Sequence, residues 1–444
     1  MPGPGEGTPH RTRVGSRGGS RVAVVNWRDL SHPAAGGAER YAWEIARRFV
    51  AEGRRVDYVT GRARGQSRRE TVDGVRVVRL GGRFTIYPLV LAWMLVRRRS
   101  WDAVLDCQNG IPFFTPWVLP RGVPVFCVVH HVHDEQFGMH FPAWLARVGR
   151  FLEGPVARRA YRRHACVAVS PSTVAAMRER LGWTGPVYVV PNGVVPPVSP
   201  PVSPAGSPPG DGAGLVCVSR LVPHKRLDRL LDLAERLQTP VHLVGRGPDE
   251  DRLRAEVTAR GLDHLVILHG YLPEDAKNAL VGRSRLHLST SRGEGWGLSV
   301  TEAAALGVPT VAYDVDGLRD AVRDGVTGWL VPAGEDAGDT VERALKELAD
   351  PRRRRETAAA CRDWAGRFDW ARSAARMAAL VDAAVRRGTA HSARPEAVVV
   401  RGADGERVVE GPVRDELLER GEAEPVRTAT ELERLLGRAG GWPR

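Results

Sequence analysis

The sequence predicts an α/β protein made of two doubly wound, parallel-sheet domains that face each other across a cleft. Three observations support this fold class. The chain has 444 residues of which 43% are hydrophobic, short β-branched runs alternate with amphipathic stretches, and the alternation breaks once near the middle. A chain of this length is expected to form two or three domains. Strands that alternate with helical stretches are typical of βαβ units around a parallel sheet.

The first domain is expected over residues 21–194, after a Gly-, Pro- and Arg-rich segment (1–20) that is expected to be disordered. Short runs rich in Val and Ala predict strands at 22–26, 56–60, 75–80, 103–106, 123–129, 165–169 and 187–190. Amphipathic stretches between them predict helices at 38–52, 86–98, 142–162 and 171–181.

Residues 195–214 are dominated by Pro, Ser and Gly, which indicates a linker before a second domain at 215–388. Strands are expected there at 215–219, 241–244, 265–268, 286–288 and 310–313. Helices are expected at 226–238, 250–260, 274–281, 299–306, 339–349, 352–368 and 370–387. The C-terminal extension, 389–444, has no chemical motif. An Asp-Gly turn predicts a hairpin of 398–401 with 408–409, and charged stretches predict helices at 413–420 and 429–437.

Composition narrows the class of protein. The five cysteines have no paired spacing, which favours reduced, buried thiols over a zinc site or a disulfide framework. The net charge of +13 fits nucleic acid, anionic lipid or an anionic small substrate. Nucleic acid is disfavoured because basic clusters such as 62–69 lack interleaved aromatic residues. No apolar run is long enough to span a bilayer and no signal peptide is visible, so a cytoplasmic protein is expected.

The stretch 292–307 carries the strongest chemical signal. It reads RGEGWGLSVTEAAALG, with Glu294 and Glu302 placed around glycines that precede a predicted helix. Glycines at a helix start allow close approach of a ligand, and the free amides of the first turn favour an anion. Carboxylates on either side can bind hydroxyl groups, which suggests a site for a sugar joined to a phosphate. The alternative is a glycine-rich turn whose glutamates are only favourable partners of the helix dipole.

Other segments follow predicted strands in the same way. Gly36 and Gly37 open the first predicted helix, where glycine permits close approach to a substrate or simply makes a tight turn. Arg220 and Lys225, in SRLVPHK, follow the first strand of the second domain and can neutralise a diphosphate. Gly247, in VGRGP, lies in another strand-to-loop turn on that edge, and PNGV (191–194) begins the expected hinge.

A histidine-rich segment ends a strand of the first domain. It reads VVHHVHDE and contains His130, His131 and His133. Three histidines and two acids suggest a metal site, but neighbouring strand residues point to opposite faces and cannot grip one ion together. A polar loop that faces the substrate is the favoured interpretation.

The ordered set of these motifs over about 21–385 resembles a retaining glycosyltransferase of the GT-B fold, family 4. The matching segments are GGAER, PNGV, SRLVPHK, VGRGP, HGY (269–271) and the two glutamates with seven residues between them. The resemblance implies two Rossmann-like domains, a nucleotide-diphosphate-sugar donor on the second domain and an acceptor on the first. It implies no bound cofactor and no metal, because arginine and lysine supply the charge that a metal would otherwise provide.

The resemblance also implies residue roles. Arg220 and Lys225 would bind the donor diphosphate and stabilise the leaving group. The helix start formed by Gly297, Leu298 and Ser299 would bind phosphate. Glu302 would bind the ribose hydroxyls, and Glu294 the transferred sugar or the positive charge that develops on it. The remaining expected site residues are Gly36, Gly37 and Gly247 in the cleft, and a cleft histidine for which His130 fits best and His131 next.

The sequence therefore predicts an enzyme that moves a sugar from a nucleotide-diphosphate donor to an acceptor hydroxyl with retention of anomeric configuration. Alternatives are a nucleotide-sugar epimerase of the same fold and a non-catalytic sugar- or lipid-binding protein. A further expectation is peripheral contact with an anionic membrane through 84–99, an apolar stretch that ends in three arginines, although a buried helix also explains it. The sequence identifies neither the sugar nor the acceptor.

Overall fold

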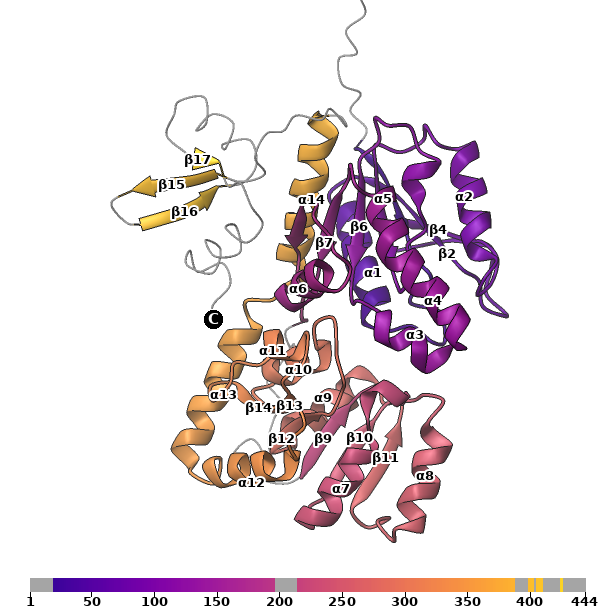
Figure 1. Ribbon diagram of the computed structural model, residues 1–444. Helices are drawn as coiled ribbons and strands as arrows, with labels where there is room; N and C mark the ends of the chain where they lie inside the picture. Colours follow the sequence, from indigo (N-terminus) through magenta and orange to yellow (C-terminus); the bar gives the residue numbers. More distant parts are fainter. Residues whose placement is uncertain (1–18, 196–213, 388–397, 403–404, 410–423, 426–444) are drawn as a thin grey trace, which may run out of the picture.

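The computed structural model describes residues 19–195, 214–387, 398–402, 405–409 and 424–425. These residues form two α/β domains with parallel sheets and a small third sheet, which confirms the predicted fold class (Figure 1). The expected disordered segment (1–20) and linker (195–214) lie almost entirely outside the described residues. The two expected tail helices (413–420 and 429–437) lie wholly outside them.

The N-terminal sheet has the strand order β3-β4-β2-β1-β5-β6-β7-β8, and all its neighbours pair in parallel except β3 with β4. Its strands are β1 (Arg21–Val25), β2 (Arg55–Thr60), β3 (Arg69–Val72), β4 (Val75–Arg79), β5 (Ala103–Gln108), β6 (Val125–Val129), β7 (Ala165–Ala168) and β8 (Val187–Val189). Strand β3 was not predicted. Its sequence RETV is mostly exposed at the sheet edge and lacks the apolar run that marks the buried strands.

Helices cover both faces of this sheet. They are α1 (Gly37–Ala51), α2 (Ile86–Val96), α3 (Asp134–His140), α4 (Ala143–Phe151), α5 (Ala157–Ala160) and α6 (Pro171–Glu179). A 3-10 turn, η1 (Thr115–Trp117), and a π-helical turn, η2 (Leu152–Val156), complete the domain. The sequence predicted one helix over 142–162. The structure divides it at η2, which contains Pro155, a residue with no amide to continue the α-helical hydrogen bonds.

The C-terminal sheet is parallel throughout its described strands, in the order β11-β10-β9-β12-β13-β14. The strands are β9 (Leu215–Val218), β10 (Val241–Val244), β11 (Val266–Gly270), β12 (Leu286–Ser289), β13 (Thr310–Tyr313) and β14 (Gly328–Val331). The helices are η3 (Pro223–Lys225), α7 (Asp228–Leu237), α8 (Glu250–Ala259), α9 (Glu274–Arg283), α10 (Leu298–Ala305), α11 (Leu318–Ala321), α12 (Ala337–Glu347), α13 (Pro351–Ala365) and α14 (Trp370–Arg387). Strand β14 and the short helix α11 were not predicted.

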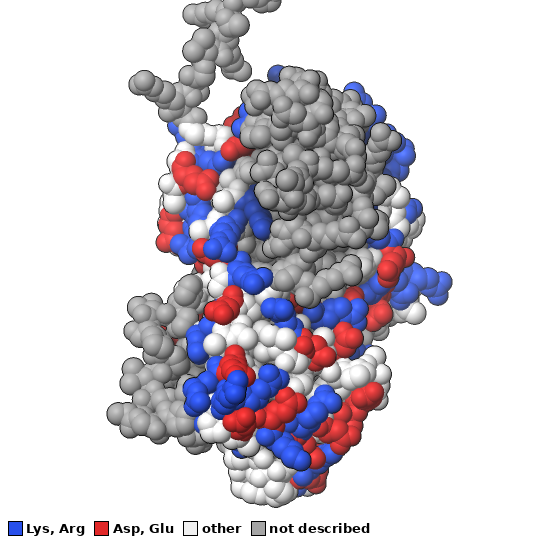
Figure 2. Space-filling model, turned by 90° about the vertical axis from the view of Figure 1, so that its left-hand side faces the viewer, with Lys and Arg blue, Asp and Glu red and all other residues white. Residues whose placement is uncertain are grey.

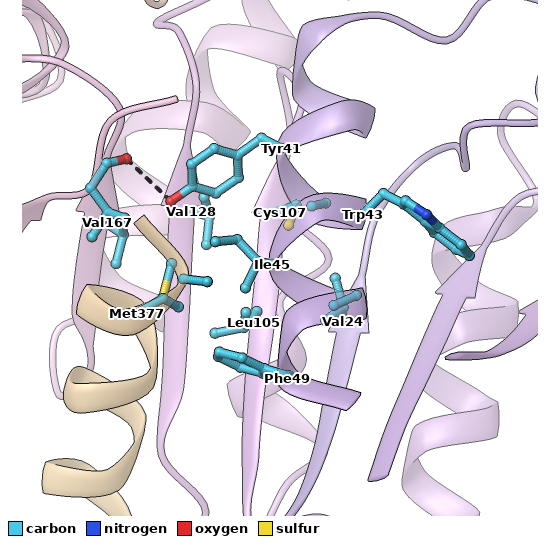
Figure 3. Packing of buried hydrophobic residues seen from close by; sticks show 14 of the residues in the cluster. Val24, Tyr41, Trp43, Ile45, Phe49, Leu105, Cys107, Val128, Val167 and Met377 are labelled. Atoms are coloured by element: carbon cyan, nitrogen blue, oxygen red, sulfur yellow. Dashed lines mark hydrogen bonds between the residues drawn. The ribbon is translucent and has the colours of Figure 1, made fainter. Parts of the chain in front are cut away.

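The regular spacing of apolar residues along helix α1 determines which of its side chains pack in the N-terminal core. Tyr41, Ile45 and Phe49 recur every four residues and point from α1 onto the sheet, as Figure 3 shows. They meet strand residues such as Leu105 and Val128 in one buried cluster. The Tyr41 hydroxyl donates a hydrogen bond to the Val190 carbonyl at 3.2 Å, so even the polar end of this buried ring is satisfied.

Helix α14 belongs to the C-terminal half of the sequence but packs on the N-terminal domain. The expected boundaries placed 370–387 in the second domain, whereas Trp370, Met377 and Val381 are buried in the same cluster as α1 (Figures 1 and 3). Arg54 makes two hydrogen bonds to Asp382, at 2.7 and 2.9 Å. Burial of these apolar side chains stabilises the packing of α14 on the N-terminal domain by several kcal/mol, at about 25 cal/mol per Å² of buried apolar surface.

The chain passes between the domains twice, at 191–194 and at 368–373, and these two crossings lie side by side. The Val194 amide donates to the Phe368 carbonyl at 2.9 Å, and the Ser373 hydroxyl donates to the Pro191 carbonyl at 2.7 Å. Gly193 lies against Trp370, where a Cβ would be 2.3 Å from the Trp370 backbone nitrogen. The glycine of PNGV is therefore required by close backbone contact.

The cysteines and the tail hairpin of the described chain agree with expectation. All five cysteines are buried, free thiols. The tail forms β15 (Val398–Gly402), β16 (Gly405–Val409) and β17 (Glu424–Pro425), with β15 and β16 antiparallel as the predicted hairpin requires. In the part of the chain that the structure describes, no helix combines the length and apolar character needed to cross a membrane.

Basic and acidic side chains are intermixed on the face drawn in Figure 2. In the C-terminal domain, for example, Arg236 forms ion pairs with Asp336, Asp339 and Glu342. Among the described residues visible on that face, the basic side chains therefore do not form one continuous patch.

We predict that Gly193→Ala lowers the free energy of unfolding by ~1–3 kcal/mol, because the added Cβ forces the two crossings apart. Gly122→Ala is the matched control, since a Cβ there meets nothing within 4 Å. Chemical denaturation of both variants measures the difference. Equal stability of the two variants would contradict the tight packing of the crossings.

Candidate functional site

The loops at the carboxyl edges of the two sheets face each other where the strand order of each sheet reverses. In the N-terminal sheet the reversal lies between β1 and β5, and in the C-terminal sheet between β9 and β12. Ligands of open α/β sheets bind in the crevice outside such reversal points. The loops that follow β1, β9 and β12 contain Gly36, Arg220 and Glu294, so the topology places these predicted residues at one site.

Glu294 lies between β12 and α10 and is paired with Lys225. Its carboxylate also accepts a hydrogen bond from the Ser291 hydroxyl at 2.8 Å. Burial alone would raise the pKa of Glu294, but the Lys225 charge and the bonds from Lys225 and Ser291 hold the pKa below its usual value. Glu294 is therefore an ionised, oriented acceptor at the floor of the cleft.

Lys225 is positioned by the backbone around η3. The Thr290 hydroxyl donates to the Lys225 carbonyl at 2.7 Å, and the Arg292 amide donates to the His224 carbonyl at 3.0 Å. These bonds join the loop after β9 to the loop after β12. The sequence places the two loops about 70 residues apart, so their pairing could not be read from local pattern.

Arg220 reaches from the C-terminal domain toward the N-terminal domain. Its Nε lies 3.4 Å from the point where a Cβ on Gly36 would stand. Within the described residues, no carboxylate lies within 4.0 Å of the Arg220 guanidinium, which is exposed at the cleft. A cation without a protein counter-ion at this position can bind an anionic ligand.

Glu302, on α10, is held by two cations that sequence reasoning missed. Arg40 from α1 donates to one carboxylate oxygen at 3.2 Å, and Lys277 from α9 donates to the other at 3.1 Å. Burial lowers the pKa of Lys277, but Glu302 and Glu274 raise it on balance, so the cation is retained. The Arg40–Glu302 pair joins the two domains. Its only sequence signal was the arginine that ends GGAER.

The predicted glycines serve different purposes. Gly297 caps α10 with φ of 89°, a left-handed conformation that favours glycine, and directs the amides of Leu298 and Ser299 toward the cleft end of the helix. The Gly36 amide is used internally, since it donates to the Glu39 carboxylate at 2.7 Å.

Gly37 and Gly247 differ in what surrounds them. A Cβ on Gly37 would meet the Leu298 side chain only at 3.9 Å, so Gly37 faces the start of α10 across the cleft. At Gly247 a Cβ would be 2.1 Å from the Leu221 carbonyl oxygen. Packing of two loops therefore explains Gly247 without a ligand.

The histidines of the β6–α3 segment point in different directions. The His130 ring is buried against Tyr41, with centroids 5.0 Å apart, and its Nε2 has no hydrogen-bond partner. The His131 ring instead faces the donor-side loop, with Cε1 3.3 Å from the Cβ position of Gly293. Burial and the His133 charge lower the pKa of both rings to about 3, so both are neutral at physiological pH.

His130 was the better sequence match for the cleft histidine, but its ring turns into the N-terminal core. The His130 carbonyl does approach the opposite domain, because a Cβ on Gly295 would be 1.9 Å from that oxygen. The segment after it forms α3, where the sequence predicted a loop. In the described ranges, no group of three or more His, Cys, Asp or Glu residues is arranged to hold a metal ion.

Glu153 is a further residue that sequence reasoning missed. It is fully buried in the π-helical turn η2, and one of its oxygens accepts from the His133 amide at 2.7 Å and from Gln108 at 3.3 Å. These bonds fix the histidine segment on the N-terminal side of the cleft. A single glutamate before Gly-Pro gave no signal that would have identified this role.

Comparisons with known proteins agree with this architecture. The family model for glycosyl transferases group 1 matches residues 204–364, and that for glycosyltransferase family 4 matches residues 35–196. The GDP-mannose-dependent α-(1-6)-phosphatidylinositol monomannoside mannosyltransferase of Mycolicibacterium smegmatis is 35% identical over 182 residues, which cover 38% of this chain and 47% of that protein. The chain thus spans less than half the length of this curated relative.

Two solved structures share the fold over 82% of this chain. Sucrose-phosphate synthase from Thermosynechococcus elongatus aligns with a TM-score of 0.67 at 18% identity and is covered over 98% of its length. HepE from Anabaena, in complex with UDP and glucose, aligns with a TM-score of 0.61 at 19% identity and is covered over 99%. These structures show that the fold is GT-B. The two family models match consecutive parts of the chain that together make up most of its length, so the chain belongs to the family 4 glycosyltransferases.

Proposed function

We propose that the protein is a retaining glycosyltransferase that moves a sugar from a nucleoside-diphosphate sugar to an acceptor hydroxyl. The observation that carries this proposal is the convergence of Arg220, Lys225 and the start of α10 on one cleft edge, with Glu294 and Glu302 beside them. Cations and helix amides suit a diphosphate, and ionised carboxylates suit the hydroxyls on either side of it.

The charge distribution supports a role for each group. As the bond to the sugar breaks, negative charge develops on the leaving diphosphate, and Arg220 and Lys225 stabilise that charge. The amides of Gly297, Leu298 and Ser299 add a helix start to the same site. These groups supply the positive charge for the leaving group, so we expect no divalent metal to be needed.

The two glutamates differ in their surroundings, and this supports different roles. Glu302 lies on α10 and keeps lone pairs beyond its bonds to Arg40 and Lys277, which suits the paired hydroxyls of a ribose. Glu294 lies in the loop between β12 and α10 and faces His131 of the N-terminal domain, which suits the transferred sugar. A neutral His131 can exchange hydrogen bonds with sugar hydroxyls on the same side.

An epimerase of the same fold and a non-catalytic binding protein are the alternatives. The relative from Mycolicibacterium smegmatis is a mannosyltransferase by name, and Lys225 and Glu294 are paired in the cleft, so transfer is favoured. An epimerase would release a changed nucleotide sugar without any acceptor, which product analysis distinguishes.

The experiment that tests the function is a thermal-shift panel of UDP-, GDP- and ADP-sugars. We expect one nucleotide class to raise the unfolding midpoint, because a ligand that binds only the folded state stabilises it. Glu302→Ala should weaken that nucleotide sugar about tenfold through loss of charge-assisted hydrogen bonds.

Glu335→Ala is the matched control, because Glu335 is an exposed glutamate that follows β14, the edge strand of the C-terminal sheet. Glu302→Gln keeps the shape of the side chain and reports whether the lost charge or the lost contact matters. A folded protein that none of the three nucleotide classes stabilises would overturn the transferase proposal.

A second prediction concerns turnover. Lys225→Ala should lower kcat about 100-fold or more, as removal of one transition-state donor typically does, while the unfolding midpoint moves by only a few degrees. Lys346→Ala, at an exposed position on α12, is the control. Wild-type kcat in the Lys225 variant would refute the leaving-group role.

We also propose that the protein contacts anionic membranes through residues 84–99. Helix α2 buries Ile86, Val90 and Met94 in the N-terminal core, which accounts for part of its apolar character. The rest is exposed: Phe84 is 65% and Val96 80% accessible, next to three arginines. An exposed apolar patch with adjacent basic residues is typical of interfacial binding.

Flotation with phosphatidylglycerol vesicles tests this contact. We expect the wild type to float with these vesicles but not with phosphatidylcholine alone, and Phe84→Ser to reduce flotation. Tyr271→Ser, which changes an exposed aromatic residue of the C-terminal domain, should leave it unchanged. Absence of binding to the anionic vesicles would rule the contact out.

A further inference from the structure

Three loops of the N-terminal domain converge on the side of the cleft opposite the proposed donor site. The Asn109 amide after β5 donates to Asn26 after β1 at 2.7 Å, and the Trp27 indole donates to the Arg83 carbonyl after β4 at 3.3 Å. We call Trp27, Arg28 and Arg83 the acceptor wall. Its backbone is fixed by these bonds between loops, so its side chains are presented in a set arrangement.

Arg28 is half-buried in this wall and is oriented without a counter-ion. Its guanidinium lies 4.2 Å from the centroid of the Trp27 ring and donates a hydrogen bond to the Ala34 carbonyl. Among the described residues no carboxylate lies within 4.0 Å of it. Burial lowers the pKa of Arg28. Glu39 opposes that effect, and the charges of Arg220 and Arg83 add to it.

Arg83 is the second cation of the wall. Its guanidinium lies 5.2 Å from the Phe84 ring and 5.7 Å from the Phe141 ring, and in the described chain it too lacks a carboxylate within 4.0 Å. Both rings, and the Trp27 indole that donates to the Arg83 carbonyl, come from the N-terminal domain. Arg83 therefore belongs to the acceptor side of the cleft.

Arg79 shows that the same region provides carboxylates for an arginine with a structural role. It is buried and forms ion pairs with Asp29 at 2.5 Å and with Glu70. Arg28, the residue next to Asp29 in sequence, receives no such partner among the described residues although it also loses solvent. Like charges that are gathered and partly desolvated are unfavourable unless a ligand neutralises them.

We propose that Arg28 and Arg83 bind a phosphate group carried by the acceptor, either on a phosphorylated sugar or on a lipid headgroup. This inference rests on the proposed transferase function, because it assigns the ligand class of the acceptor half of that site. Two planar guanidinium groups can each make paired hydrogen bonds to phosphate oxygens. The bound phosphate would hold the acceptor hydroxyl near His131 and Glu294.

Calorimetric titration with inorganic phosphate tests the site directly. The protein is held in saturating UDP, GDP or ADP, whichever stabilises it, so that the donor phosphates are already in place, and sodium chloride matches the ionic strength. We expect one phosphate to bind. Arg28→Ala and Arg83→Ala should each weaken it about tenfold through loss of a charge-assisted contact. Arg121→Ala, at an exposed arginine before β6 and away from the cleft edge, should not change it.

Several results would overturn the inference. These are no phosphate binding above the chloride control, wild-type phosphate affinity in both wall variants, or complete displacement of phosphate by the nucleotide, which would assign the wall to the donor. Because Arg83 is exposed, its variant remains informative even if the Arg28 variant is unstable. If no nucleotide binds, the transferase proposal fails separately, and the same titration without nucleotide still decides whether the wall binds phosphate.

Paired ligands distinguish the two sources of phosphate. Glucose 6-phosphate is compared with glucose, and soluble dihexanoyl phosphatidic acid with dihexanoyl glycerol, which lacks the phosphate, so that no bilayer is present. The inference is supported if a phosphomonoester binds more tightly than its matched control and if this preference depends on Arg28 and Arg83. The phosphomonoester that binds more tightly of the two identifies the source of the phosphate. Equal binding of glucose and glucose 6-phosphate, and of the two lipids, would contradict it.

Discussion

The structure depends on the paired chain crossings between the two domains. The Val194–Phe368 backbone bond and the burial of Trp370 attach the end of the C-terminal half to the core of the N-terminal domain. Without this attachment, the linker near residue 195 would be the only covalent constraint on domain orientation. With it, the reversal points of the two sheets face each other, and a site can be built from both edges.

Charged side chains at the cleft of each domain contact or approach residues of the other domain. Glu302 of the C-terminal domain accepts a hydrogen bond from Arg40 of the N-terminal domain, while Arg220 reaches back toward Gly36. Close backbone approach at Gly295 and His130 leaves no room for a side chain between the domains there. The contacts between the domains therefore bring together the groups proposed for the donor and the wall proposed for the acceptor, an arrangement that in such enzymes commonly assembles a catalytic site and excludes water.

The sequence predicted those parts of the fold and site that depend on local pattern. Buried β-branched runs identified the strands, and the glycines before α10 identified a ligand-binding turn. What it missed depends on tertiary contact. The edge strand β3 is polar because one side faces solvent, the π-helical turn around Glu153 follows from packing near Pro155, and Arg40 pairs with Glu302 across 262 residues. The choice between His130 and His131 required the orientation of two adjacent rings, which no spacing rule provides.

The proposed function places a nucleoside-diphosphate sugar between the β9 and β12 loops, with the N-terminal domain over it. Amide hydrogen exchange with and without the stabilising nucleotide sugar tests this most directly, because it locates protection along the backbone. We expect slower exchange at 220–226 and 290–302, together with the start of α1 near Gly37. Protection confined to other segments, with the nucleotide sugar demonstrably bound, would contradict it.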